Sequence, residues 1–285
     1  MTSVQIQGYA GVPIRSFDDW ARYALPPARN EVHWQPDRSA CELGRIWTVR
    51  GEPAVPDQLA QLLESHEGTR RMVILSGITE RETLLPFGNR GPRCHDLALQ
   101  AEQDGRAVTI CIEAKADESF GRTITQELST ARKRAAKREG GHTRFPERLD
   151  WLTCSLLGLR AFEDAQHQVL DGVVADLPYQ LLPAIAGTLL EAGHRKASKA
   201  VFVVHEFRTA KTANANLDAN ADALNRFLRV FLSANGASAG ESFELGCGHI
   251  VGPISITERH VEGTTKIPCD IPLFIGKIRT DLLAD

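Results

Sequence analysis

A short hairpin signal near the middle of the chain constrains the fold more than any other feature. Asp104-Gly105 separates two runs of alternating residues, 94–102 and 107–115. An Asp-Gly pair is typical of a two-residue type I′ turn, which needs positive φ at both central positions. The sequence therefore predicts an antiparallel hairpin in which Gln103 pairs with Arg106.

Counting outward from that pair brings Asp96 directly opposite Glu113 on one face of the hairpin. Side chains of such a pair lie roughly 5 Å apart, and two carboxylates this close repel each other unless a positive charge lies between them. Strand alternation adds Lys115 to the face of Glu113. The pattern predicts a site for a divalent cation, because Mg²⁺ is held by carboxylates, waters and phosphate oxygens.

These residues supply the groups that metal-assisted hydrolysis of a phosphodiester needs. A metal ion polarises the phosphate and lowers the pKa of its bound water, and Lys115 would orient or activate that water. The competing interpretation is that Asp96, Glu113 and Lys115 are solvated charges on the outer face of an ordinary hairpin. Two like charges placed opposite each other favour the site.

The pattern of Asp96, a hairpin and Glu113-x-Lys115 resembles the PD-(D/E)XK nuclease superfamily, whose restriction-endonuclease-like core has the order αβββαβ. The expected elements follow a similar order: a helix over 56–66, a strand over 72–76, the hairpin, a helix from Tyr179-Gln180-Leu181-Leu182 to about 196, and an apolar strand over 200–207. The resemblance covers roughly residues 56–207 and extends to a bacterial branch of that superfamily.

The resemblance implies a role for each matching residue. Asp96, Glu113 and the carbonyl of Ala114 would bind the metal ion, which would be Mg²⁺ with Mn²⁺ as the alternative. Lys115 would be catalytic, and Gln180 would join it from the start of the later helix. An alternative for Gln180 is a helix-start residue that bonds only to backbone. The implied substrate is nucleic acid, with DNA favoured over RNA by analogy.

The match has departures. His95 precedes Asp96 where the superfamily often has proline, and Pro183 falls inside the expected helix, where it should remove a backbone hydrogen bond. The superfamily often adds a glutamate from its first helix. Glu42 and Glu64 are the two candidates here, although the favoured interpretation of each is a solvated helix residue.

These features predict an α/β fold with a mixed β-sheet flanked by helices. The restriction-endonuclease-like αβββαβ core would span 56–207, between an N-terminal helical elaboration over 1–55 and a C-terminal helix and β-hairpin elaboration over 208–285. Residues 78–93 are expected to form a loop-rich stretch. Apolar residues 201–204 indicate a central strand that is covered on both faces.

The composition is that of a globular protein, with 42% hydrophobic and 24% charged residues. No run approaches the roughly 20 apolar residues of a membrane span, and the first residues lack the pattern of a secretory signal. The six cysteines are scattered singly, which argues against a zinc ribbon. We therefore expect reduced cysteines in a cytoplasmic protein without membrane contact.

The net charge of −3 gives no overall signature of nucleic-acid binding. One segment is basic, however: Arg132, Lys133, Lys137 and Arg138 would share adjacent faces of a helix. Such a cluster can bind a phosphate backbone with salt-sensitive affinity. The alternative is a solvated helix end, because basic residues favour C-terminal turns and Gly140-Gly141 follows.

The sequence therefore favours a metal-dependent nuclease. One rival is a nuclease-fold interaction module of a defence or repair system that no longer cleaves. Another is a phosphodiesterase that acts on a small substrate at the same metal site. No Gly-rich phosphate loop and no Gly-x-Ser-x-Gly elbow occurs in the sequence, which excludes a P-loop enzyme and an α/β-hydrolase.

Overall fold

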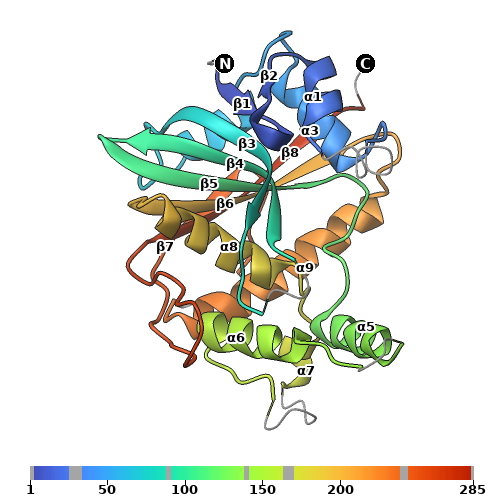
Figure 1. Ribbon diagram of the computed structural model, residues 1–285. Helices are drawn as coiled ribbons and strands as arrows, with labels where there is room; N and C mark the ends of the chain where they lie inside the picture. Colours follow the sequence, from blue (N-terminus) through green and yellow to red (C-terminus); the bar gives the residue numbers. More distant parts are fainter. Residues whose placement is uncertain are drawn as a thin grey trace.

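The structure of the chain is a computed structural model. It describes residues 3–25, 34–87, 91–137, 141–162, 170–237 and 243–283. Within these residues, eight strands form one mixed sheet in the order β2-β1-β3-β4-β5-β6-β8-β7 (Figure 1). This sheet and its flanking helices confirm the predicted α/β fold class.

The strands come from all parts of the chain. They are β1 Gln5–Gln7, β2 Pro13–Ile14, β3 Val73–Thr83, β4 Arg93–Gln103, β5 Arg106–Lys115, β6 Lys199–Arg208, β7 His249–Ile254 and β8 Leu273–Asp281. β4 runs antiparallel to both of its neighbours, β3 and β5, whereas β5, β6 and β8 run parallel to one another. The carboxyl ends of β5, β6 and β8 therefore meet at one edge of the sheet.

Helices cover both faces of the sheet (Figure 1). They are α1 Phe17–Tyr23, α3 Ser39–Trp47, α4 Asp57–Glu64, α5 Ile124–Ala136, α6 Phe145–Leu157, α7 Gly172–Ala175, α8 Leu181–His194 and α9 Asn214–Ala234, with a short 3-10 helix η1 Tyr9–Gly11. Among the described residues, none of the helices has the length and apolar character that crossing a membrane requires.

The sheet separates two hydrophobic cores. Val201 and Val203 of β6 pack toward α1, α3 and α4, whereas Phe202 and Val204 pack toward α6, α8 and α9. All four side chains are fully buried. The structure thus confirms the prediction of a central strand covered on both faces, as its continuous apolar run indicates.

The β4–β5 hairpin has the predicted turn and register. Asp104 and Gly105 both adopt positive φ, 49° and 74°, as a type I′ turn requires. Gln103 pairs with Arg106, and the same register continues without a shift along the hairpin. Local turn chemistry therefore determines which residues of the two strands lie opposite each other.

The loop-rich stretch expected over 78–93 is wrong at its two ends, because β3 extends to Thr83 and β4 begins at Arg93. The described residues between them, 84–87 and 91–92, lie outside helices and strands, as expected. Glu80 has φ 48°, a conformation that is uncommon for residues other than glycine. The strand changes face there: Thr79 bonds a carbonyl on the α1 side, whereas Arg81 bonds α8. β3 therefore bends over α8 after Glu80 (Figure 1).

Candidate active site

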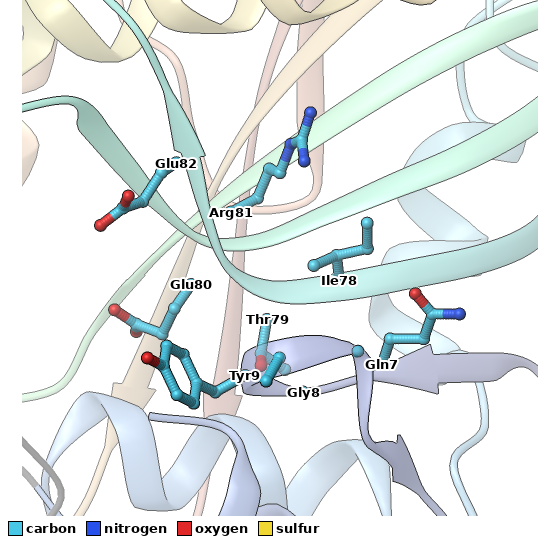
Figure 2. Close-up of a pocket in the computed structure, with 10 residues that line it drawn as sticks. Gln7, Gly8, Tyr9, Ile78, Thr79, Glu80, Arg81 and Glu82 are labelled. Carbon is cyan, nitrogen blue, oxygen red and sulfur yellow. The ribbon is translucent and has the colours of Figure 1, made fainter. Parts of the chain in front are cut away.

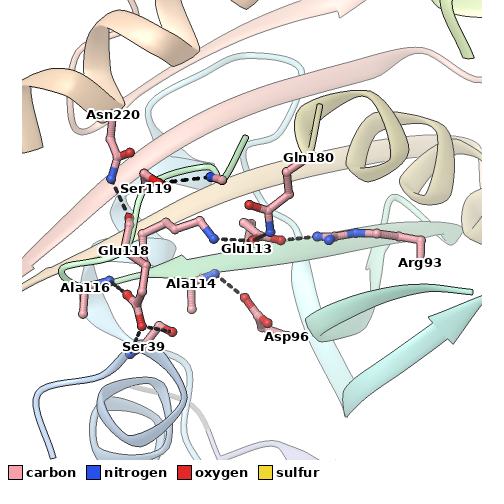
Figure 3. Close-up of polar contacts among 12 residues, drawn as sticks. Ser39, Arg93, Asp96, Glu113, Ala114, Ala116, Glu118, Ser119, Gln180 and Asn220 are labelled. Carbon is pink, nitrogen blue, oxygen red and sulfur yellow. Dashed lines mark hydrogen bonds and ion pairs between the residues drawn. The ribbon is translucent and has the colours of Figure 1, made fainter. Parts of the chain in front are cut away.

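Glu113 is the centre of a buried charged cluster on the α8 face of the sheet (Figure 3). Its Oε1 accepts hydrogen bonds from Lys115 Nζ at 2.7 Å and from Gln180 Nε2 at 2.5 Å. Its Oε2 accepts a hydrogen bond from the guanidinium of Arg93. Charge-assisted bonds of this kind are strong, so three donors fix the orientation of this carboxylate.

Three segments bring these donors together. Alternation along β5 puts Lys115 on the face of Glu113, Arg93 is the first residue of β4, and Gln180 is the N-cap residue of α8. Pro183 lies in the first turn of α8, where backbone N–H groups have no partner within the helix. The proline therefore leaves the helix intact, contrary to expectation, and Gln180 reaches the sheet.

Asp96 contacts the strand of Glu113 through its side chain, which bonds to the backbone of β5. The ladder between β4 and β5 ends at the pair of Leu97 and Ile112. Just beyond it, Asp96 Oδ2 accepts a hydrogen bond from the backbone N–H of Ala114 at 2.6 Å (Figure 3). The carboxylate thus supplies an acceptor where the strands separate, because a buried backbone donor needs one.

The two carboxylates have opposite pKa shifts. Burial acts to raise the pKa of Glu113, but the charges of Arg93 and Lys115 outweigh burial and hold it below its usual value. Burial raises the pKa of Asp96 well above its usual value, and the negative charges of Glu113 and Glu80 add to that rise. Asp96 is therefore where negative charge is least well compensated.

Sequence reasoning missed two members of this cluster, Arg93 and Glu80. Glu80 lies across from Asp96 in the β3–β4 register, and Cys94 Sγ donates to its Oε2 at 3.1 Å. Both residues belong to the stretch that was expected to be a loop. Recognising it as strand would have placed Glu80 beside Asp96.

A neutral histidine packs behind Arg93. Burial and the neighbouring charge of Arg93 lower the pKa of His95 to about 3, so its ring is uncharged at neutral pH. Gly187 of α8 lies against both residues: a Cβ at this position would be 2.9 Å from Arg93 Cγ and 2.9 Å from His95 Nε2. The missing side chain therefore lets α8 approach the sheet closely.

The loop after β5 covers Lys115. The ring centroid of Phe120 is 5.6 Å from Lys115 Nζ, within the range of a cation–π contact. Glu118 ties the loop to two helices, since its carboxylate accepts a bond from Ser39 Oγ at 3.0 Å and its carbonyl accepts one from Asn220 Nδ2 at 2.9 Å (Figure 3). Only 7% of Lys115 is exposed as a result.

A cavity of about 280 Å³ lies beside the cluster. Arg93 and Gln180 line this cavity and also bind Glu113, so these two side chains connect the cavity with the carboxylate. The lining residues are Leu85, Pro92, Arg93, Cys94, Glu127, Arg148, Tyr179, Gln180 and Pro183.

A second cavity, of about 380 Å³, lies between η1 and β3 (Figure 2). Glu80 and Glu82 line it, together with the exposed ring of Tyr9. Arg81 also lines it, but its guanidinium turns away to bind Glu191 of α8. The charged groups that remain are acidic, so this cavity is unsuited to a phosphate.

The residues predicted to contact nucleic acid lie on and just after α5. Arg132 and Lys133 belong to this helix, Lys137 is its C-cap residue, and all three are exposed. Arg138 lies outside the described residues. The helix therefore presents basic groups to solvent, apart from the buried cluster around Glu113.

Glu42 and Glu64, the two acids that the resemblance offered from an early helix, are used locally. Glu42 Oε1 accepts a hydrogen bond from the backbone N–H of Asp37, and Glu64 Oε2 accepts one from the backbone N–H of Arg71. The glutamate that lies near Asp96 is instead Glu80, on a strand.

The donor set determines what kind of metal ion the cluster suits. Across the described part of the chain, no three or more His, Cys, Asp and Glu side chains are grouped so that they could hold a metal ion. An ion bound by Asp96 and Glu113 would take its other ligands from the Ala114 carbonyl, water or substrate. Oxygen ligands and uncompensated negative charge fit Mg²⁺, which usually has one or two carboxylates and several waters.

Comparison with known proteins identifies the family of the chain but assigns it no activity. A family model described as Domain of unknown function (DUF6946) matches residues 13–282. No curated protein and no solved structure matches the chain. The assignment of a function therefore depends on the geometry of the residues themselves.

Proposed function

We propose that this chain, which belongs to the DUF6946 family, is a metal-dependent nuclease of the PD-(D/E)XK type that hydrolyses phosphodiesters of nucleic acid, with DNA as the favoured substrate. The observation that carries the proposal is the meeting of Glu113, Lys115 and Gln180 in one hydrogen-bonded cluster, with Asp96 bonded to the neighbouring Ala114 N–H. These are the positions that the superfamily pattern marks.

Asp96, Glu113 and the carbonyl of Ala114 would hold Mg²⁺ or Mn²⁺. The ion would polarise the scissile phosphate and acidify a bound water. Two features support this assignment: the ligands are hard oxygen atoms, and the pKa of Asp96 is raised by burial and by neighbouring negative charge, which an added cation would relieve.

The residues of the chain supply positioning and charge. Lys115 Nζ, held at 2.7 Å from Glu113, would orient the attacking water. Gln180 Nε2 donates to the same oxygen of Glu113, Oε1, and helps to fix this carboxylate. Arg93 would donate to a phosphate oxygen beside Glu113, because a guanidinium can bind carboxylate and phosphate oxygens. The exposed helix α5 would bind the phosphate backbone farther along the strand.

Two rival functions also have support. Glu113 is buried and already has three donors, which is how a structural ion pair in a non-cleaving interaction module would look. The adjoining cavity of about 280 Å³ is small, which favours a phosphodiesterase with a small substrate. Free cysteines at all six positions support a reducing compartment such as the cytoplasm for each of these functions.

The first experiment measures cleavage of single-stranded DNA, duplex DNA and RNA with Mg²⁺ and with Mn²⁺. We expect cleavage of DNA, and a rate lower by a factor of about 10²–10⁴ in Lys115→Ala, the usual contribution of a positioned proton-transfer group. Lys199→Ala is the matched control: Lys199 lies on the neighbouring strand β6, and its Nζ bonds Gln103 at the hairpin end of the sheet.

Three outcomes separate the functions. Cleavage by Lys115→Ala at the rate of the unaltered protein would show that this site does not carry out the reaction. Absence of cleavage of every polymer, with no heat of Mg²⁺ binding, would favour the interaction module. Hydrolysis of a small phosphodiester such as a bis-nitrophenyl phosphate, without cleavage of polymers, would favour the small-substrate enzyme.

A further inference from the structure

The cavity beside Glu113 contains a donor that lacks a partner among the described residues. Arg93 is anchored at one end by Glu113, and only 9% of its side chain is exposed. Its Nε is buried and, within the same residues, has no hydrogen-bond acceptor. A buried N–H without an acceptor is costly, and a phosphate or base oxygen entering the cavity would supply that acceptor after a small rotation of the side chain.

The walls of the cavity combine a fixed aromatic ring with apolar surface. The ring of Tyr179 packs edge-on against Phe145 at a centroid distance of 5.0 Å, which holds the ring in place. Leu85, Pro92 and Pro183 add apolar walls. An aromatic ring with apolar neighbours is the surface on which proteins stack single bases.

The polar groups of the cavity are also fixed before any ligand binds. Arg148 Nε and Nη2 donate to the carbonyls of Pro86 and Gly91, both at 3.1 Å, so the arginine holds the chain that leads into β4. Glu127, which also lines the cavity, provides a carboxylate that can accept from the amino group of a base. The cavity is therefore preorganised, which lowers the cost of binding.

The size of the cavity limits what can enter. Its volume of about 280 Å³ is just below the range of about 300–1,000 Å³ for drug-sized ligands. That space suits one planar base and excludes a stacked base pair. A base that enters must therefore be unpaired, or be extruded from the duplex at the cost of its pairing and stacking.

We infer that this cavity binds the base of one unpaired nucleotide, with the attached phosphate beside Arg93 and Glu113. The inference rests on the proposed function, since it assigns the substrate of the same site. It makes the nuclease selective for single-stranded DNA, for frayed ends or for unpaired bases. The ligand chemistry is a single nucleotide unit, whether it belongs to a strand or is free.

The test measures binding in EDTA, so that no strand is cleaved. The probe is a single-stranded DNA oligonucleotide that carries one 2-aminopurine, whose fluorescence falls when the base stacks on an aromatic ring. We expect saturable quenching, and an affinity about 10-fold lower for Tyr179→Ala, within the roughly 1–3 kcal/mol of a base–aromatic stack. Tyr179→Phe keeps the ring and should bind like the unaltered protein.

Two controls guard against a folding defect. Tyr9→Ala removes an exposed tyrosine from the other cavity and should leave the affinity unchanged. A second measurement changes the DNA instead of the protein: a strand with an abasic site in place of the 2-aminopurine should compete more weakly by a similar factor. This comparison needs no variant protein.

The outcomes of the inference and of the proposed function are distinct. Cleavage by the unaltered protein, with equal binding of abasic and complete strands and no effect of Tyr179→Ala, would overturn the inference and leave the nuclease intact. Quenching that depends on Tyr179, without cleavage of any nucleic acid, would support the nucleotide site and reject the nuclease. Equal affinity for free dAMP and for the strand would support a site for a free nucleotide.

Discussion

A buried glutamate lies at each end of helix α8, Glu191 within the helix itself and Glu113 on the neighbouring strand β5, and the two differ in the charge around them. At the C-terminal end, Glu191 accepts bonds from Arg81, Arg195 and Thr83, so two cations surround one carboxylate. At the N-terminal end, Gln180 contacts Glu113.

At the N-terminal end of α8, negative groups outnumber positive ones. Glu80, Asp96 and Glu113 act on one another there, and Arg93 and Lys115 compensate them only in part. One end of α8 therefore has an excess of positive charge and the other an excess of negative charge. The comparison shows that burial of an ion pair does not by itself indicate a cation site, because a cation needs the excess of negative charge that only the N-terminal end has.

The largest expected effect is on stability at the C-terminal end. Glu191→Gln leaves Arg81 and Arg195 without their carboxylate, and breaking a buried pair costs about 3–5 kcal/mol. We expect a loss of unfolding free energy at the low end of this range, about 3 kcal/mol, because 39% of the Arg81 side chain is exposed to solvent. Glu113→Gln should lower the free energy of unfolding by less, since the carboxylate of Asp96 remains near Arg93 and Lys115. Urea unfolding of both variants gives the two free energies, and equal losses would contradict the comparison.

The next effect is stabilisation by a metal ion. Mg²⁺ at 100 times its dissociation constant should stabilise the protein by about 2.7 kcal/mol, because it binds only the folded state. Asp96→Asn should abolish this gain, and Glu191→Gln should retain it. The melting temperature in EDTA and in Mg²⁺ measures the difference. A gain of the same size in Asp96→Asn would mean that the ion binds elsewhere.

A smaller effect concerns pH in the absence of metal. Because the pKa of Asp96 is raised in the folded protein, the stabilisation linked to its proton is present at low pH and lost as the pH rises through that folded-state pKa. Asp96→Asn stays neutral and still accepts from the Ala114 N–H. The variant should therefore be more stable at pH 7–8, by on the order of 1 kcal/mol.

The same variant should match the unaltered protein near pH 4, because Asp96 is then protonated in the folded state. Thermal unfolding in EDTA across this range measures the difference between the two proteins. A difference that stays constant from pH 4 to pH 8 would show that Asp96 carries no unbalanced charge.

The smallest effect is on the exposed helix. Lys133→Glu together with Lys137→Glu should weaken DNA binding a few-fold and reduce its salt dependence, by roughly one unit of slope for each phosphate that the helix no longer binds. Arg226→Glu, on the exposed side of α9, changes charge at a comparable surface position and should have no such effect. Equal slopes for the variants and the control would exclude α5 from the DNA interface.

The sequence predicted those parts of the site that depend on local chemistry. Asp104-Gly105 determines the turn, and alternation then places Asp96, Glu113 and Lys115 without any knowledge of the rest of the fold. The position of Gln180 could also be predicted, because the start of an apolar helix is a strong local signal.

The sequence did not predict the parts that depend on packing. Thr79-Glu80-Arg81-Glu82 reads as a polar loop, yet it is strand, because Glu191 of α8 supplies a buried polar partner for Arg81. A strand whose core face is charged does not show apolar alternation. Arg93 and Glu80 were missed for that reason.

Gly187 lets α8 pack close to the sheet, and both the fold and the candidate site depend on this close packing. A methyl group there would collide with Arg93 and His95, so the helix would have to retreat and Gln180 would lose its reach to Glu113. A chain of this family with a larger residue at 187 needs a smaller one at 93 or 95. Evolution at these three positions should therefore be coupled, and a single substitution among them should be seen only with its compensating partner.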